Sequence, residues 1–155
     1  MIKLNIGCGR KLKEGYINID LRKTKPEVVV ADIRKLPYKN NTVDEIYAND
    51  VFEHVPFNES VDLLTHWVSK LKPRGVLKLQ TTDACGLARS MLKQTSVSGI
   101  EAFIRKTFGG QDYKFNFHFT AGHPVLMEHY LRQAGIKGEI TITPKGTNMR
   151  VEAVK

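Results

Sequence analysis

Near the start of the chain stands the stretch Leu4-Asn5-Ile6-Gly7-Cys8-Gly9, in which apolar and polar residues alternate and then give way to glycines. The alternation predicts a β-strand over residues 2–6. Glycine lets a backbone turn tightly and approach a ligand closely. The stretch therefore predicts a strand that runs into a ligand-binding loop. The dinucleotide pattern G-x-G-x-x-G is incomplete, because Leu12 stands where its third glycine would be.

Three further predicted strands end in polar residues that a ligand could use. They are residues 16–19 before Asp20, residues 28–31 before Asp32, and residues 43–48 before Asn49 and Asp50. The aliphatic run 28–31 is typical of a strand buried on both faces. In open α/β sheets, ligands bind outside the carboxyl ends of the strands. We therefore expect these four polar ends to share one site.

The rest of the chain alternates between helix and strand patterns. It predicts a helix over 57–71 closed by Pro73 and then a strand over 76–80. Two helical pieces within 84–107, broken near 96–99, are followed by a loop over 109–122 and a helix over 124–134. The chain closes with strands over 136–143 and 148–154, joined by a turn at 144–146. This order predicts one α/β domain over residues 1–155: a Rossmann-like, doubly wound, mostly parallel sheet with a C-terminal antiparallel hairpin, covered on both faces as a three-layer sandwich. Residues 83–122 would be an insertion on the substrate side.

Composition narrows the class of protein. The chain has 155 residues with 41% hydrophobic side chains, as expected for one globular domain. Its two cysteines predict neither a disulfide framework nor a metal site. With no apolar stretch long enough for a signal peptide or a membrane span, we expect a cytoplasmic protein without a membrane partner. The net charge of +8 is spread along the chain, so a nucleic-acid or anionic partner stays open but is not favoured over a solvated basic surface.

The polar strand ends fit the parts of a nucleoside ligand. A carboxylate at Asp20 can accept hydrogen bonds from both hydroxyls of a ribose, and one at Asp32 can accept from an exocyclic adenine amine. Asn49 and Asp50 could line the pocket beside a cationic ligand centre, which carboxylates and amide dipoles favour. Each of these residues could instead be an ordinary turn or cap residue.

Taken in order, these motifs resemble the class I S-adenosylmethionine-dependent methyltransferases, in particular small proteins with a type 11-like methyltransferase domain. The resemblance covers residues 1–82 and is carried by residues 4–9, Ile19-Asp20, residues 31–37, residues 41–55 and residues 71–75. Gly109-Gly110-Gln111 and Asn116-Phe117-His118 add a less specific similarity to small methyltransferases whose substrates are unassigned.

The resemblance implies an S-adenosylmethionine site made of Gly7, Cys8, Gly9, Asp20, Leu21, Asp32, Ile33 and Asn49. Gly7 and Gly9 would face the methionine part of the cofactor. Asp20 would hold the ribose, Asp32 and the Ile33 backbone the adenine. Asn49 would approach the sulfonium.

The chain also departs from the family pattern. An N-terminal helix is missing, the connection between Gly9 and Tyr16 is too short for a full helix, and Arg74 stands where the family often has glycine. These departures imply an open pocket, a lid supplied by the substrate, by a partner chain or by a second copy in a homodimer, or reduced activity.

The expected reaction is in-line transfer of a methyl group to an unidentified acceptor, either a small molecule or a carrier-linked one. Because the cofactor is already activated, the protein mainly supplies alignment. A base helps where the acceptor must lose a proton, and the candidates are His118, His54 and Asp50. Histidine suits this task because it titrates near neutral pH.

Four alternatives are considered. The chain could be a non-catalytic S-adenosylmethionine-binding subunit of a complex, or a methyltransferase directed at nucleic acid. Nucleic-acid binding as the main task is supported only by the charge, because the chain contains no zinc-finger, RNA-recognition or helix-turn-helix signature. A nicotinamide dehydrogenase is disfavoured by Leu12 and by the Asp32 strand end.

Overall fold

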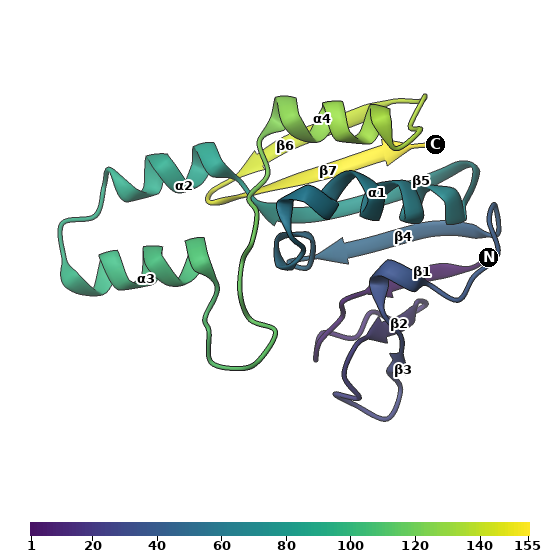
Figure 1. The fold of residues 1–155 in the computed structure, drawn as a ribbon, viewed down its shortest axis with the longest axis horizontal. Helices are drawn as coiled ribbons and strands as arrows, with labels where there is room; N and C mark the ends of the chain where they lie inside the picture. Colours follow the sequence, from purple (N-terminus) through teal and green to yellow (C-terminus); the bar gives the residue numbers. More distant parts are fainter.

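The computed structural model describes residues 1–155 and contains one seven-stranded sheet (Figure 1). The strands are β1 (Lys3–Ile6), β2 (Ile17–Asp20), β3 (Val29–Val30), β4 (Val43–Asn49), β5 (Leu71–Thr82), β6 (Ile140–Lys145) and β7 (Asn148–Val154). The helices are α1 (Ser60–Lys70), α2 (Ala84–Met91), α3 (Val97–Phe108) and α4 (Pro124–Gln133), with short 3-10 helices η1 (Ile33–Lys35), η2 (Phe52–His54) and η3 (Phe57–Glu59). None of the helices is long and apolar enough to cross a membrane.

The strand order is β3-β2-β1-β4-β5-β7-β6. Strands β1 to β5 pair in parallel, whereas β7 is antiparallel to both β5 and β6. The chain winds outward from β1 to β3 and then returns to place β4 on the other side of β1. The predicted Rossmann-like, doubly wound, mostly parallel sheet with a C-terminal antiparallel hairpin is therefore confirmed. Ligands of such sheets bind where the winding direction changes, outside the carboxyl ends of β1 and β4.

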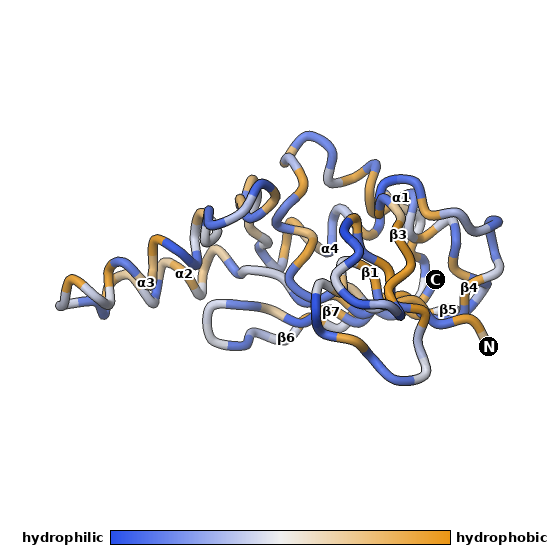
Figure 2. The backbone as a smooth tube through the Cα atoms, turned by 90° about the horizontal axis from the view of Figure 1, so that it is seen from below, coloured by the Kyte–Doolittle hydropathy of each residue, from blue (hydrophilic) through white to orange (hydrophobic).

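Helices cover only one face of this sheet. Figure 2 shows α1 and α4 on the same side, and Figure 1 shows the α2–α3 hairpin projecting away from the sheet. Trp67 and Leu64 of α1 and Leu131 of α4 are fully buried in one cluster with sheet residues such as Ile46 and Leu77. This cluster is the hydrophobic core.

The opposite face of the sheet is polar. Asn5 pairs with Tyr47, Tyr47 with Lys78, and Gln80 with Arg150, so all five side chains point to that face. The expected three-layer arrangement is therefore not formed. The physical reason is the connection of residues 7–16, which crosses this face without forming a helix.

Several predicted element bounds also change. The strand near residue 28 was expected to be buried on both faces, but β3 is two residues long, lies at the sheet edge, and leaves Val29 and Val30 42% and 54% exposed. Strand β5 begins at Leu71, ahead of Pro73, so the helix ends earlier than predicted. Pro144 lies inside edge strand β6, where a missing N–H is tolerated, and the hairpin turn falls at Gly146 and Thr147 instead.

Most other predictions for the second half of the chain are confirmed, although the closing strand predicted over 136–143 begins only at Ile140, as β6. Residues 84–108 form two helices, residues 109–122 contain no helix and no named strand, and α4 begins at Pro124. Gly135 follows α4 with φ of 98°, the left-handed conformation that ends many helices.

Candidate functional site

A cavity of about 560 Å³ lies at the carboxyl ends of β1, β2 and β4. Its volume is within the range of small-molecule sites. All eight residues expected to bind the cofactor line it, together with two of the three candidate bases, Asp50 and His54. They are Gly7, Cys8, Gly9, Asp20, Leu21, Asp32, Ile33 and Asn49. The structure thus brings together residues that the sequence spreads over four strand ends.

The glycine loop forms the floor of this cavity. Gly7 and Gly9 both have left-handed backbones, with φ of 61° and 52°. A side chain on Gly7 would overlap Val51, whereas the position of a Cβ on Gly9 is open to the cavity. Burial, with the nearby Asp20 carboxylate, raises the pKa of the Cys8 thiol to about 11. The thiol therefore stays protonated at neutral pH and is no nucleophile.

Asp20 ties the glycine loop to β2. Its side chain is buried, and its Oδ2 accepts a hydrogen bond from the Gly9 N–H at 2.8 Å. Its Oδ1 accepts one from the Arg22 N–H at 2.9 Å. A carboxylate has about four acceptor positions, so capacity for ribose hydroxyls remains.

Asp32 caps a short helix. Its Oδ1 accepts from the Arg34 N–H at 2.9 Å, and its Oδ2 lies 3.0 Å from the Arg34 guanidinium. Burial opposes ionisation, but the hydrogen bonds from Arg34 outweigh it and lower the pKa of the Asp32 carboxyl. An adenine amine at this carboxylate would share it with Arg34.

Asp50 lines the site, and its carboxylate is held by side-chain amides. Its backbone is left-handed, with φ of 54°, an uncommon conformation that is enriched at functional positions. Its Oδ1 accepts from the Gln80 and Asn148 amides at 3.1 and 3.0 Å, and its Oδ2 accepts from the Asn49 amide at 2.7 Å. Because three amides hold this carboxylate, it suits electrostatic stabilisation better than proton transfer.

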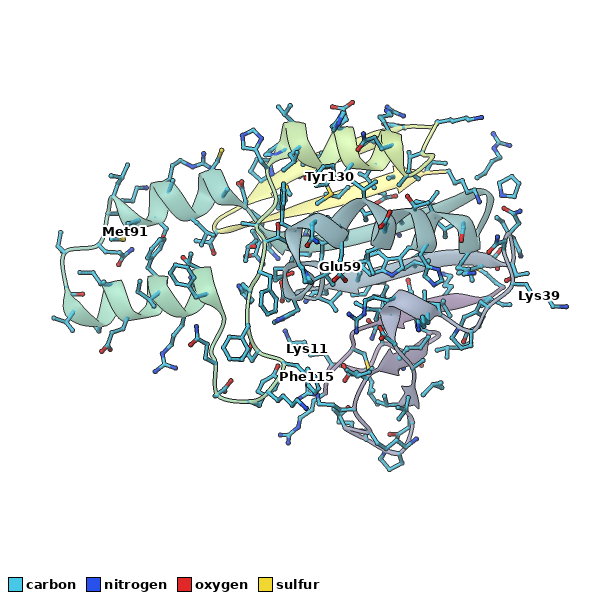
Figure 3. The ribbon with its side chains drawn as sticks, in the orientation of Figure 1. Lys11, Lys39, Glu59, Met91, Phe115 and Tyr130 are labelled. Carbon is cyan, nitrogen blue, oxygen red and sulfur yellow. The ribbon has the colours of Figure 1, made fainter.

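The Glu53-His54 pair anchors the loop of residues 109–122. The Glu53 carbonyl accepts from the Phe119 N–H at 2.8 Å, and His54 Nδ1 lies 2.9 Å from the Phe117 carbonyl oxygen. Side chains of this loop form the aromatic wall of the cavity: Tyr113, Phe115, Phe117 and Phe119. Figure 3 shows Phe115 on this wall and Lys11 on the glycine-loop side, two residues that line the same cavity from distant parts of the sequence.

His118 does not line the cavity. Its ring meets the His54 ring edge-on at 4.9 Å, and its Nδ1 lies 3.0 Å from the Lys106 carbonyl oxygen. Burial, with the neighbouring His54, lowers the pKa of His118. Of the two histidines considered as bases, His54 therefore faces the cavity and His118 lies behind it.

Four basic residues of the cavity were not singled out from the sequence. They are Arg10, Lys11, Arg22 and Arg34. The available signal was their position, since each lies one or two residues beyond Gly9, Asp20 or Asp32, the polar residues that follow the predicted strands. No group of three or more histidine, cysteine or carboxylate side chains is arranged to hold a metal ion.

Comparisons with known proteins agree with this geometry. Residues 7–79 match the family model of a methyltransferase domain. A search of curated protein sequences finds no match.

Similar folds occur among solved structures. A SAM-dependent methyltransferase from Thermotoga maritima has a TM-score of 0.66 at 17% identity, over 99% of this chain and 82% of that one. A chain of the complex between the Haloferax volcanii Trm112 methyltransferase activator and a methyltransferase has a TM-score of 0.65 at 12% identity, over 99% and 81%. The trans-methyltransferase CalH in complex with SAH has a TM-score of 0.61 at 16% identity, over 99% and 51%.

The sequence match over residues 7–79 and the fold of the whole chain point to the same kind of protein. Residues 7–79 carry a methyltransferase-domain sequence, and the chain has the class I methyltransferase fold. The resemblance to class I S-adenosylmethionine-dependent methyltransferases is confirmed.

Proposed function

We propose that this chain is an S-adenosylmethionine-dependent methyltransferase whose acceptor is still to be identified. The observation that carries this proposal is the convergence of eight residues, named from the sequence, on one cavity at the winding reversal of the sheet. The residues present also fit the cofactor. Gly9 leaves open space where a side chain would stand, and Asp20 offers a buried carboxylate beside it.

In this proposal Gly7, Cys8 and Gly9 contact the methionine part, Asp20 and Leu21 the ribose, and Asp32 and Ile33 the adenine. Asn49 approaches the sulfonium, with the Asp50 carboxylate held next to it by hydrogen bonds. A carboxylate near a cationic sulfur favours cofactor binding.

Bound S-adenosylmethionine supplies a methyl group on a positively charged sulfur, so that an acceptor lone pair bonds to the methyl carbon while the carbon–sulfur bond breaks and leaves its electrons on sulfur. The chain's own contribution is alignment, which is worth up to ~7–11 kcal/mol in favourable cases. Its aromatic wall, from Tyr113 to Phe119, restricts water at the reacting atoms.

His54 is the proposed acceptor of the proton lost by the methyl acceptor. Its Nδ1 is bonded to the Phe117 carbonyl oxygen, which requires the proton on Nδ1 and leaves Nε2 with a free lone pair. His118, with its ring against His54, positions that ring.

The test of cofactor binding is calorimetric titration of the purified chain with S-adenosylmethionine, its demethylated product and NAD. We expect micromolar binding of the first two and none of NAD, because Leu12 removes the third glycine of the dinucleotide pattern. Binding of NAD alone would overturn the proposal.

The test of the base uses His54→Gln, with an acceptor found by screening for release of the demethylated product. Loss of a general base typically costs about 10²–10⁴-fold in turnover. We expect a kcat lower by about that factor and unchanged cofactor affinity. His129→Gln, an exposed histidine on α4, is the matched control. Equal kcat in both variants would remove His54 from the chemistry.

A second candidate is a cofactor-binding subunit that acts only within a complex. One observation favours it: α3 has no buried residue, and Leu92 and Val97 at the tip of the α2–α3 hairpin are 87% and 76% exposed. One similar solved structure is a complex with a methyltransferase activator. Cofactor binding without turnover by the purified chain, over a broad acceptor screen, would favour this candidate.

A further inference from the structure

The polar face of the sheet carries a second cavity, of about 360 Å³. The strand residues Asn5, Tyr47 and Gln80 form part of its floor. In this chain the cavity exists because the β1–β2 connection forms no helix over that face. Gly7, Cys8, Lys11, Asn49 and Asp50 line both cavities, so the two share a wall.

The second cavity is strongly cationic. Lys11, Lys13, Lys145 and Arg150 line it, against the single carboxylate of Asp50. A concave site lined by one sign of charge focuses the electrostatic potential and concentrates ligands of the opposite charge.

We propose that this second cavity binds the phosphate group of a phosphorylated small-molecule methyl acceptor. That the bound molecule is a methyl acceptor rests on the proposed methyltransferase function. The anion site itself is argued from the charges and contacts of the cavity alone.

The first argument is that two of the four cations, Lys145 and Arg150, are not already neutralised by a carboxylate. The Lys145 ammonium has no hydrogen-bond or ion-pair partner, and the Arg150 guanidinium has only the Gln80 amide oxygen, at 3.4 Å. By contrast, Glu45 on the same face is already paired with Lys78 at 3.4 Å. The Asp50 carboxylate accepts hydrogen bonds from three amides and forms an ion pair with Lys11 at 3.9 Å. The Lys145 ammonium and the Arg150 guanidinium can therefore donate hydrogen bonds to an anion with several oxygens.

The second argument is that one cation is held in place. The Lys13 ammonium lies 4.9 Å from the centre of the Tyr16 ring and 4.7 Å from that of Tyr47. Two aromatic faces restrict where the ammonium can move, which lowers the entropic cost of ordering it around a ligand.

The third argument is position. Asn49 and Asp50, proposed to lie beside the sulfonium, belong to the wall between the cavities. A compact acceptor with its phosphate in the second cavity can place its reactive atom at that wall. Both cavity volumes fit small molecules, which favours a phosphorylated metabolite over a polymer.

The experiment measures binding of inorganic pyrophosphate by calorimetry without cofactor. We expect one site in the wild-type chain. The double variant Lys145→Gln/Arg150→Gln should weaken it about tenfold or more, because each charge-assisted hydrogen bond is worth roughly 1.5–3 kcal/mol. The matched control is Lys39→Gln/Lys137→Gln, which removes the same net charge from exposed positions outside both cavities; Figure 3 labels Lys39. The control should bind pyrophosphate like the wild type.

Equal weakening in both double variants, or no binding by the wild type, would overturn the site. A single-stranded oligonucleotide is the second probe. If it binds more tightly than pyrophosphate, with affinity that falls steeply with salt and is lowered by both double variants, the partner is a polyanion on the whole surface and the small-molecule assignment fails.

The two proposals fail separately. Pyrophosphate binding without S-adenosylmethionine binding would refute the methyltransferase function and leave the anion site standing. Cofactor binding without pyrophosphate binding would refute the anion site and leave the methyltransferase function standing.

Discussion

Asp20→Ala is expected to weaken the binding of S-adenosylmethionine by about a hundredfold or more. In the wild type the carboxylate accepts the Gly9 N–H at 2.8 Å and the Arg22 N–H at 2.9 Å, and in the proposed complex it also accepts from the ribose. Hydrogen bonds to a charged group are worth roughly 1.5–3 kcal/mol each. Losing the two proposed bonds from the ribose hydroxyls therefore corresponds to a loss of affinity of about a hundredfold or more. Calorimetric titration with the cofactor measures the change directly.

Asp44→Ala supplies the control for this prediction. Asp44 also accepts a backbone N–H, that of Ile2 at 2.6 Å, and a cationic group, Lys72 Nζ at 2.8 Å. It does not line either cavity. Its loss should lower stability and leave cofactor affinity within about twofold. If the two variants bind the cofactor equally well, the ribose assignment of Asp20 is wrong.

The residues that line the first cavity at the strand ends could be predicted because their signals are local. A glycine-rich turn or an aspartate directly after an apolar run marks a strand end wherever that strand lies in the sheet. The parallel arrangement then brings Gly9, Asp20 and Asn49 to the same edge. That inference needed the order of the elements and no knowledge of side-chain packing.

The position of a strand within the sheet could not be read in the same way. Residues 28–31 are aliphatic enough for a central strand, yet β3 has a neighbour on only one side and is exposed. The sequence of β5, by contrast, contains a pattern that predicts the polar face of the sheet. Lys78 and Gln80 in β5 alternate with Leu77 and Leu79, a pattern typical of a sheet with one solvated face.

The proposed acceptor side depends on contacts between distant residues. The sequence offered both His118, in an aromatic loop, and His54, before a helix, as candidate bases and placed His118 first. Their difference arises because the Phe119 N–H bonds to the Glu53 carbonyl oxygen and turns Phe117 and Phe119 toward the cavity. No local pattern encodes such a loop closure.

Glu53→Gln is expected to remove a pH dependence of stability. Burial is the main cause that raises the pKa of the Glu53 carboxyl to about 7, with Asp50 adding to it and the Thr81 hydroxyl at 2.9 Å opposing it. In the unfolded chain this carboxyl ionises near pH 4.5, the ordinary value. Between these two pKa values the folded state retains a proton that the unfolded state has released.

The sign follows from this difference. The contribution of Glu53 to the free energy of unfolding is fully present below about pH 4.5, falls as pH rises to about 7, and is constant above. At about 1.4 kcal/mol per pKa unit, the loss amounts to roughly 3 kcal/mol. Glutamine keeps an oxygen that can accept from Thr81 and carries no charge. The variant should therefore be more stable than the wild type by up to roughly that amount at pH 8 and about equal to it at pH 4.5.

Urea denaturation between pH 4.5 and 8 tests this prediction. The relevant quantity is the difference in unfolding free energy between the variant and the wild type, because other groups titrate in both proteins and cancel. Glu101→Gln on α3 is the control, since the Glu101 side chain is exposed and is solvated before and after unfolding. We expect its curve to run parallel to that of the wild type, while the curve of Glu53→Gln diverges above pH 5. If the Glu53→Gln curve is also parallel, the buried carboxylate is ionised in the folded protein, and a polar group or water not apparent from its contacts with Thr81 must stabilise its charge.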